Sequence, residues 1–236
     1  MPLPSVSVVI PAFNEEGALN DLLAECLAAL EATGAVFDIT VVNDGSTDAT
    51  PRIIDAWAAK VPGRVKRKDH ACRKGLAAAV ETAFQSGGNE CVFLLHADGQ
   101  YSPQSIAECL RLIAGADAVI LVRKHKFYGP WRELLSCGYR WLPKLLFGVD
   151  LRDPGGAKCI RRAVLADIRP VSSGVFRDPE RMIRAVRRGK KIEFLPVDIR
   201  PRVSGVAQGG RLKLALLSVA EVAGLWWRTA VLRQPW

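Results

Sequence analysis

Short runs with strand character alternate with longer helical stretches through the first half of this 236-residue chain, and this alternation constrains the fold most. Strands are predicted at residues 5–11, 37–42, 64–68, 91–95 and 118–122. Helical periodicity fills the intervals, at residues 18–30, around 53–57, at 75–85 and at 106–113. This order predicts an α/β fold with a doubly wound, mostly parallel sheet, which binds ligands at the carboxyl ends of its strands.

The second half of the chain is less regular. A basic helix is predicted at residues 181–188, a strand at 191–197 and a last helix from Gly209-Gly210 to Trp227. No repeat or linker divides the chain, so we expect one domain over residues 1–210 and a C-terminal amphipathic helical appendage over residues 211–236. Glu221 interrupts the longest apolar stretch, and no export signal precedes the first strand. With six scattered cysteines and no CxxC pair, the chain is expected to be cytoplasmic.

The formal net charge of +9 favours an anionic partner, although a solvated basic surface is the alternative. The excess lies in three stretches, at residues 64–74, 123–126 and 181–191. No helix-turn-helix, zinc-finger or RNA-binding signature accompanies them, so nucleic acid is not expected. Phosphorylated small molecules and anionic lipid head groups fit the charge better.

Polar side chains follow the apolar run at residues 91–95. His96, Asp98 and Gln100 are spaced two apart, so they can face the same side of an extended segment. Imidazole, carboxylate and amide oxygen together suggest a divalent cation, and behind it a phosphate.

Four segments in order resemble glycosyltransferase family 2, and within it the polyprenyl- or dolichyl-phosphate sugar synthases. They are VVIPAFNEE (8–16), VVNDGSTD (41–48), RKGLAAA (73–79) and HADGQYSP (96–103). The resemblance extends from about Ser5 to about Gly210. It implies a GT-A fold, a nucleotide-sugar donor in the N-terminal half, inversion at the anomeric carbon and a divalent metal, Mg²⁺ or Mn²⁺.

By resemblance, donor binding involves Pro11, Ala12, Phe13, Asn14, Glu15, Asp44, Lys74, Ala97, Asp98, Gly156 and Arg202. The chemistry agrees with this placement. Phe13 with Pro11 can form an apolar wall for a base, and Asp44 can accept bonds from base or ribose. Lys74 can neutralise a diphosphate, or it is simply a solvated helix start. Small residues around Gly156 would let the backbone approach the sugar.

His96 stands where the family pattern has its first aspartate, whereas Asp98 and Gln100 match the remaining metal contacts. Three outcomes are open. His96 ligates a softer metal than Mg²⁺, or it hydrogen-bonds the donor while Asp98 binds the metal, or catalysis is weakened.

The resemblance also assigns the acceptor side. Arg123 and Arg132 match arginines that meet an acceptor phosphate, which a guanidinium can hold through two parallel bonds. With Asp98 and Arg202 they form the expected catalytic set. Asp178 and Glu180 are candidate bases if the acceptor is a hydroxyl, because a phosphate acceptor is already an anion.

The sequence therefore predicts transfer of one sugar from a GDP- or UDP-sugar to a polyprenyl phosphate. Tryptophans beside arginines and lysines, at residues 131–147 and 211–228, predict peripheral contact with the inner face of the cell membrane. The alternatives are a glycan or lipid hydroxyl acceptor, or a catalytically weakened protein that binds nucleotide sugars. A dinucleotide dehydrogenase is poorly supported, since no GxGxxG follows the first strand.

Overall fold

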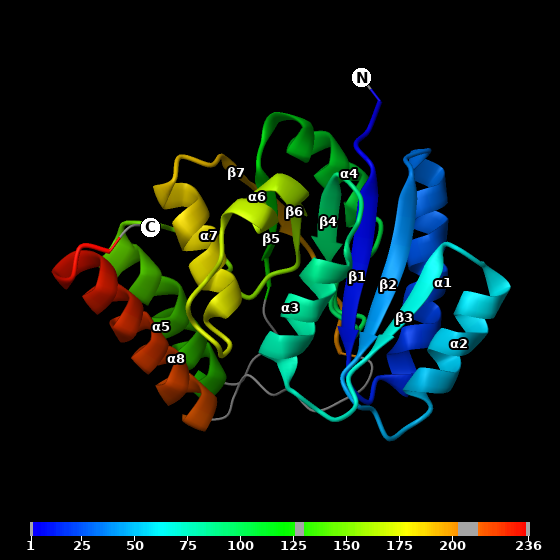
Figure 1. Ribbon diagram of the computed structural model, residues 1–236, viewed down its shortest axis with the longest axis horizontal. Helices are drawn as coiled ribbons and strands as arrows, with labels where there is room; N and C mark the ends of the chain where they lie inside the picture. The colour runs from blue at the N-terminus through cyan, green and yellow to red at the C-terminus, as the bar shows by residue number, and fades with distance from the viewer. Residues whose placement is uncertain (1, 126–129, 203–211, 235–236) are drawn as a thin grey trace.

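The computed structural model describes residues 2–125, 130–202 and 212–234, which form a seven-stranded sheet with helices on both faces (Figure 1). The strands are β1 (Val6–Ala12), β2 (Phe37–Asn43), β3 (Val65–Asp69), β4 (Cys91–Leu94), β5 (Ala118–Arg123), β6 (Lys158–Arg161) and β7 (Ile192–Val197). Their order in the sheet is β3-β2-β1-β4-β6-β5-β7. Only β6 runs antiparallel to its neighbours, β4 and β5. The predicted mostly parallel α/β sheet is confirmed.

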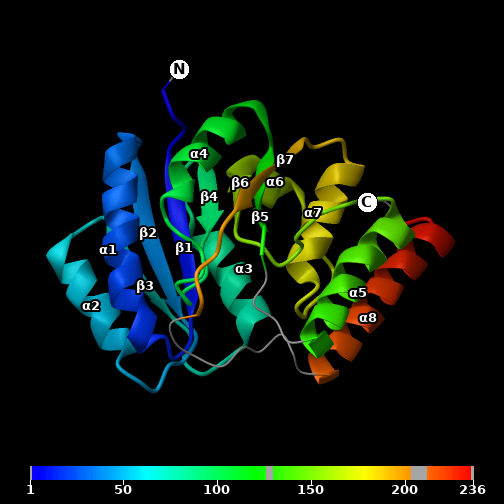
Figure 2. The same ribbon diagram turned by 180° about the vertical axis from the view of Figure 1, so that it is seen from behind.

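The helices divide between the two faces of the sheet. Those on one face are α1 (Glu16–Thr33), α2 (Thr50–Lys60) and α4 (Ser105–Leu112), followed by a short 3-10 turn, η1 (Ile113–Gly115). The opposite face carries α3 (Leu76–Ser86), α6 (Arg162–Asp167) and α7 (Arg177–Arg187). Beyond α7 lie α5 (Pro130–Phe147) and α8 (Leu212–Trp226), which ends in the π-helical turn η3 (Trp227–Val231). Figures 1 and 2 show α5 and α8 side by side, on the side of the molecule away from α2.

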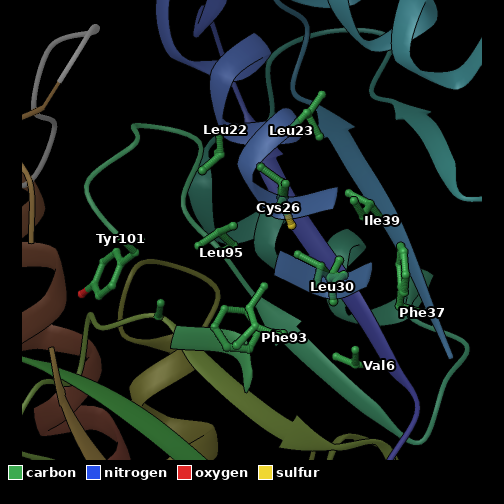
Figure 3. Packing of buried hydrophobic residues seen from close by; sticks show 14 of the residues in the cluster. Val6, Leu22, Leu23, Cys26, Leu30, Phe37, Ile39, Phe93, Leu95 and Tyr101 are labelled. Carbon is green, nitrogen blue, oxygen red and sulfur yellow. The ribbon is translucent and has the colours of Figure 1, made fainter. Parts of the chain in front are cut away.

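The core has two layers because successive side chains of a strand point to opposite faces. On β1, Val6, Val8 and Ile10 join the layer under α1, and Val9 joins the layer under α3. Every residue of β1 and β2 is buried, as expected for strands covered on both faces. Figure 3 shows the α1 layer, in which Tyr101 joins the core directly after the polar segment that follows β4.

Several element boundaries differ from the predicted ones. Helix α4 begins at Ser105 and not at Ser102-Pro103, while α7 begins at Arg177, four residues before the predicted start. The sequence reading missed β6 because that strand is short and opens with Lys158, whose charge is compensated only in the tertiary structure. The predicted boundary at residue 210 lies outside the described residues. Within those residues, no helix combines the length and apolarity that crossing a bilayer requires.

Candidate functional site

The polar segments found in the sequence meet at one edge of the sheet, the edge formed by the carboxyl ends of the parallel strands. Ala12 pairs with Asn43 at the ends of β1 and β2, so the loops that leave these strands start side by side. Because β6 runs the other way, its start lies at this edge and brings residues 153–157 there.

The loops after β1 and β2 are joined by Asn14. Its backbone N–H donates to Ser46 Oγ (3.1 Å), and its Oδ1 accepts from the backbone N–H of Thr47 (2.9 Å). Asn14 has φ +54°, a left-handed conformation that asparagine tolerates better than most residues. Beside it, the backbone N–H of Glu15 donates to Thr50 Oγ1 (2.9 Å). Asn14 and Glu15, both predicted to contact the donor, therefore lie where hydrogen bonds join these two loops.

Asp44 is buried and organises the loop at residues 70–75. Its Oδ1 accepts from the backbone N–H of Lys74 (2.9 Å), and its Oδ2 accepts from that of Gly75 (2.8 Å). His70 Nδ1 lies 2.7 Å from Asp44 Oδ1, and His70 Nε2 lies 2.9 Å from Thr82 Oγ1. Since a carboxylate oxygen accepts, His70 carries its proton on Nδ1. The sequence reading foresaw a ligand contact at Asp44 but not this loop-building role.

The residues predicted to form an apolar wall for a base differ in exposure. Pro11 and Ala12 are buried as the last residues of β1. Phe13 is partly exposed, and the guanidinium of Arg73 lies 4.0 Å from the centre of its ring. Phe13 and Arg73 therefore form a cation–π pair at this position. Lys74 is exposed at the same loop.

Asp98 and Arg202 form an ion pair between segments that lie far apart in the sequence. Arg202 Nη2 donates to Asp98 Oδ2 at 2.6 Å, across 104 positions of the chain. Gln100 fixes the same region, since its carbonyl accepts from the backbone N–H of Arg200 (2.9 Å) and its Nε2 donates to the Arg200 carbonyl (3.4 Å). The structure thus brings together Asp98, Gln100 and Arg202, three of the predicted site residues. Ala97, between them, is buried.

His96 Nε2 is buried and has no hydrogen-bond partner among the described residues. Burial is the main cause that lowers the pKa of His96. The cations of Lys158 and Arg123 lower this pKa further, and the carboxylates of Asp98 and Asp178 partly oppose them. The imidazole is therefore neutral at pH 7 and keeps a lone pair that a ligand can use.

The guanidinium of Arg123 binds the buried carboxylate of Asp153 through two parallel hydrogen bonds. Its Nε and Nη2 donate to the two oxygens of Asp153, each at 2.6 Å. The sequence predicted that such a fork would hold an acceptor phosphate, whereas here it anchors the loop at residues 153–157. Gly156 in that loop has no room for a side chain, because a Cβ would lie 2.3 Å from the Leu121 carbonyl oxygen. Its small size serves packing against β5, a reason the sequence did not reveal.

Lys158 and Asp178 form a second ion pair near His96. Lys158 is fully buried, and its Nζ donates to Asp178 Oδ2 and to the Pro154 carbonyl (3.2 Å). Asp178 Oδ1 is buried without a hydrogen-bond partner in the part of the chain that the structure describes. Buried polar atoms without a partner are rare in proteins, and contact with a bound ligand is one way to satisfy such an atom.

Glu180, the other predicted base, is fully buried and saturated. Its carboxylate accepts from the backbone N–H groups of Val171 (2.9 Å) and Ser172 (2.8 Å) and from Arg184 Nε (2.6 Å). These bonds hold the loop before α7, so Asp178 is the better candidate for a base. Arg132 lies on α5, and its side chain is outside the described residues.

The sequence prediction assigned no role to His70, Asp153 or Lys158. His70 directly follows β3 and Lys158 opens β6, while Asp153 and Lys158 bound a segment, residues 153–158, that resembles a motif of the family. Their partners lie between 20 and 30 positions away, so their pairing becomes visible only in the fold.

Fold and site define an α/β protein that presents carboxylate, imidazole and guanidinium groups at the carboxyl edge of its sheet, the place where such sheets bind ligands. A model of the family described as glycosyl transferase family 2 matches residues 7–168. This chain belongs to that family of glycosyltransferases. The match confirms the family predicted from the four motifs.

Two curated relatives carry informative names. The polyprenol monophosphomannose synthase of Mycolicibacterium smegmatis is 30% identical over 239 residues, covering 93% of this chain and 87% of that protein. The undecaprenyl-phosphate 4-deoxy-4-formamido-L-arabinose transferase of Shewanella sediminis is 32% identical over 163 residues, or 67% of this chain. That alignment spans 47% of the Shewanella protein, about half its length.

Solved structures confirm the GT-A fold. Glucosyl-3-phosphoglycerate synthase from Mycobacterium tuberculosis, solved with Mn²⁺, UDP and phosphoglyceric acid, superimposes with a TM-score of 0.74 at 18% identity. The match covers 94% of this chain and 78% of that one. The same enzyme solved with Mg²⁺ and UDP gives a TM-score of 0.72 at 17% identity, covering 94% and 79%.

Proposed function

We propose that this protein transfers a single sugar from a GDP- or UDP-sugar to a polyprenyl phosphate, with inversion, at the cytoplasmic face of the membrane. The observation that carries the proposal is the contact between Asp98 Oδ2 and Arg202 Nη2, 2.6 Å long, at the carboxyl edge of the sheet. It joins a carboxylate of the expected metal-binding motif to a cation suited to a diphosphate. The relatives named as polyprenyl-phosphate sugar transferases support the acceptor class.

The residues at this edge fit a divalent cation, Mg²⁺ or Mn²⁺. His96 offers a buried nitrogen without a partner, Asp98 a carboxylate and Gln100 an amide oxygen. No three His, Cys, Asp or Glu side chains converge within residues 2–125, 130–202 and 212–234, so Gln100 and the donor phosphates are needed to complete the ligand set. When bound, the cation would neutralise charge on the departing diphosphate.

Arg202 and the loop pair at β1 and β2 serve the donor in this proposal. Arg202 is partly exposed, and its guanidinium exchanges Asp98 for the donor diphosphate when the donor binds. Phe13 with Arg73 offers the flat surface for the base, while Asn14, Glu15 and Asp44 hold the loops around it. This arrangement stabilises the leaving group through fixed charges.

The acceptor approaches from the side of β5 and α7. Arg123 holds Asp153 and thereby the loop that carries Gly156, and Arg132 on α5 remains the predicted contact of the acceptor phosphate. A phosphate monoester is already anionic near pH 7, so its attack needs alignment more than proton removal.

The paired helices α5 and α8 supply a surface suited to lipid. Their exposed apolar side chains, with η3, are Trp141, Leu145, Leu216, Leu217, Val219, Trp226, Trp227 and Val231. Lys144 Nζ lies 5.1 Å from the Trp141 ring centre, and Arg140 and Arg228 are also exposed. Aromatic rings beside long cationic side chains match the interface of an anionic membrane. We propose peripheral contact of this surface with the membrane that holds the acceptor.

The direct test offers the protein a panel of GDP- and UDP-sugars with undecaprenyl phosphate and Mn²⁺ or Mg²⁺. We expect one donor to yield a lipid-soluble sugar phosphate. Absence of transfer from every donor with both metals would contradict the proposal. Nucleotide binding measured by calorimetry without any metal dependence would then favour a protein that binds nucleotide sugars but does not transfer them.

A hydroxyl acceptor is the second candidate, and the unpartnered Oδ1 of Asp178 favours it. A hydroxyl must lose its proton, and general bases typically contribute about 10²–10⁴-fold. Asp178→Asn should therefore abolish transfer to a glycan or lipid hydroxyl but reduce transfer to a polyprenyl phosphate only modestly. Comparing the variant's rates with both acceptors decides between the two.

A further inference from the structure

The loop that leads into α7 is held by two carboxylates that bind five of its backbone N–H groups. Glu180 takes those of Val171 and Ser172. Glu221 Oε1 takes those of Ser173 (3.1 Å) and Gly174 (2.6 Å), and its Oε2 takes that of Phe176 (3.2 Å). The second carboxylate comes from α8, at least 45 positions further along the chain.

Glu221 lies on the buried side of α8, beside the buried Ser218. Its neighbours on that side, Val222 and Leu225, are each 2% exposed and pack in the same layer as Phe176 and Met182 of the α7 region. A charge in such a position is costly unless hydrogen bonds compensate it. The three N–H donors of the loop provide that compensation, which explains why an acid interrupts the most apolar helix of the chain.

Gly174 makes this contact sterically feasible. A Cβ on residue 174 would lie 2.8 Å from Glu221 Oε2 and 2.9 Å from Oε1. The loop and the carboxylate are thus fitted to each other, and a side chain at residue 174 would push them apart.

The held loop leads directly to Asp178, in the first turn of α7. The backbone N–H of Arg177 donates to the Gly174 carbonyl (3.1 Å), so the loop passes into the helix without a break. Asp178 then pairs with the buried Lys158, which in turn bonds the Pro154 carbonyl of the acceptor-side loop. A continuous set of contacts therefore connects Glu221 of α8 to Asp178, Lys158 and the loop that contains Pro154.

We propose that Glu221 is a positioning residue that ties the lipid-facing helix α8 to Asp178, so that docking of α8 on the acceptor membrane fixes the Asp178–Lys158 pair. Leu216, Leu217 and Trp226 of α8 are exposed to solvent and available for contact with lipid. The inference rests on the proposed lipid-phosphate acceptor, and it adds that membrane contact and acceptor alignment are coupled through one carboxylate.

A double-mutant cycle tests the coupling. Glu221→Gln, Asp178→Asn and the double variant are compared for transfer to undecaprenyl phosphate in phosphatidylcholine–phosphatidylglycerol vesicles. We expect Glu221→Gln to lower kcat/KM for the lipid by no more than the modest factor seen in Asp178→Asn, with the donor KM unchanged, and to add nothing in the Asp178→Asn background. Losses that multiply in the double variant would overturn the proposal. Glu108→Gln, at an exposed glutamate of α4, is the matched control.

Amide hydrogen exchange over residues 171–178 gives a readout that does not depend on transfer. Vesicles should slow exchange there in the wild type but not in Glu221→Gln, and equal slowing in both would overturn the coupling. If Glu221→Gln does not fold, Gly174→Ala disturbs the same contact from the loop side. A wild type that shows this exchange pattern but transfers no sugar to the lipid would refute the proposed acceptor and leave the coupling supported.

Discussion

His96 replaces the first aspartate of the related motif, and this exchange alters the ligand chemistry at the edge of the sheet. The structure keeps the imidazole neutral by burial and leaves its Nε2 without a partner among the described residues. Imidazole nitrogen suits transition metals, whereas Mg²⁺ prefers oxygen. Of the three outcomes that the sequence left open, ligation of a softer metal agrees best with this environment.

His96→Asp should shift metal preference toward Mg²⁺. Because the change replaces nitrogen with oxygen, we expect the affinity ratio of Mn²⁺ to Mg²⁺, in the presence of the bound nucleoside diphosphate, to fall at least about tenfold. Calorimetric titration of both metals measures the ratio. The spin-echo signal of a nitrogen coupled to Mn²⁺ should also disappear in the variant. A ratio and a signal identical to those of the wild type would show that His96 does not ligate the metal.

Asp44, a predicted donor contact, also has a role in local structure. Its two oxygens accept hydrogen bonds from the backbone N–H groups of Lys74 and Gly75, and His70 donates a further hydrogen bond to its Oδ1. A sequence motif reports only that an aspartate is present. That this aspartate fixes a loop 30 positions away follows from the parallel pairing of β2 and β3, which sets Asn43 beside Asp69.

At the scale of elements, the short strand β6 decides where the loop at residues 153–157 lies. It inserts antiparallel between β4 and β5, so the loop that precedes it reaches the edge where the parallel strands end. Gly156 in this loop packs against the backbone of β5, and Arg123 at the end of β5 holds Asp153. The position of the loop therefore depends on close backbone packing as well as on the ion pair.

Gly156→Ala should destabilise the protein, because its Cβ would lie 2.3 Å from the Leu121 carbonyl oxygen. Overpacking of this kind costs about 2 kcal/mol, which corresponds to a fall of about 5 °C in Tm for a domain of this size. Thermal unfolding measures the change. Gly155→Ala is the matched control, since its Cβ would meet nothing closer than Arg123 Nη2 at 3.9 Å. Equal Tm values for the two variants would contradict the packing argument.

At the scale of the whole molecule, the loops proposed to bind the donor and the surface proposed to contact lipid lie in different parts of the fold. The loops proposed to bind the donor follow β1, β2 and β4, while α5 and α8, which carry the proposed lipid surface, lie beyond α7 (Figures 1 and 2). A water-soluble donor and a lipid acceptor can therefore approach from different directions. The net charge of +9 favours an anionic membrane at long range.

Removing exposed tryptophans from this surface should weaken membrane binding. Trp141 is 58% exposed and Trp227 is 54% exposed. Replacing both with serine removes apolar area worth about 1.5–3 kcal/mol each when fully buried in lipid, so binding to phosphatidylglycerol-containing vesicles should fall at least tenfold. Vesicle flotation measures the bound fraction. Val36→Ser, an exposed apolar position between α1 and β2, should bind like the wild type, and equal loss in both would argue against a localised surface.

The sequence by itself determined the family, the mostly parallel sheet and the edge at which the site lies. Strand and helix periodicities are local properties, and Asn14, Asp44 and Asp98 belong to short contiguous motifs that follow strands. The carboxyl ends of parallel strands share an edge by geometry, so the gathering of these residues could be inferred without coordinates.

Only the tertiary structure decided how the charges pair. The partners of Arg123, Lys158 and Glu221 are separated from them by 20 to 48 positions, and no local pattern links them. Each pairing depends on burial, because a charge removed from water must find compensation wherever the fold brings a donor or acceptor within reach. For the same reason the sequence could not distinguish Glu180, whose two oxygens accept hydrogen bonds, from Asp178, whose Oδ1 has no partner among the described residues.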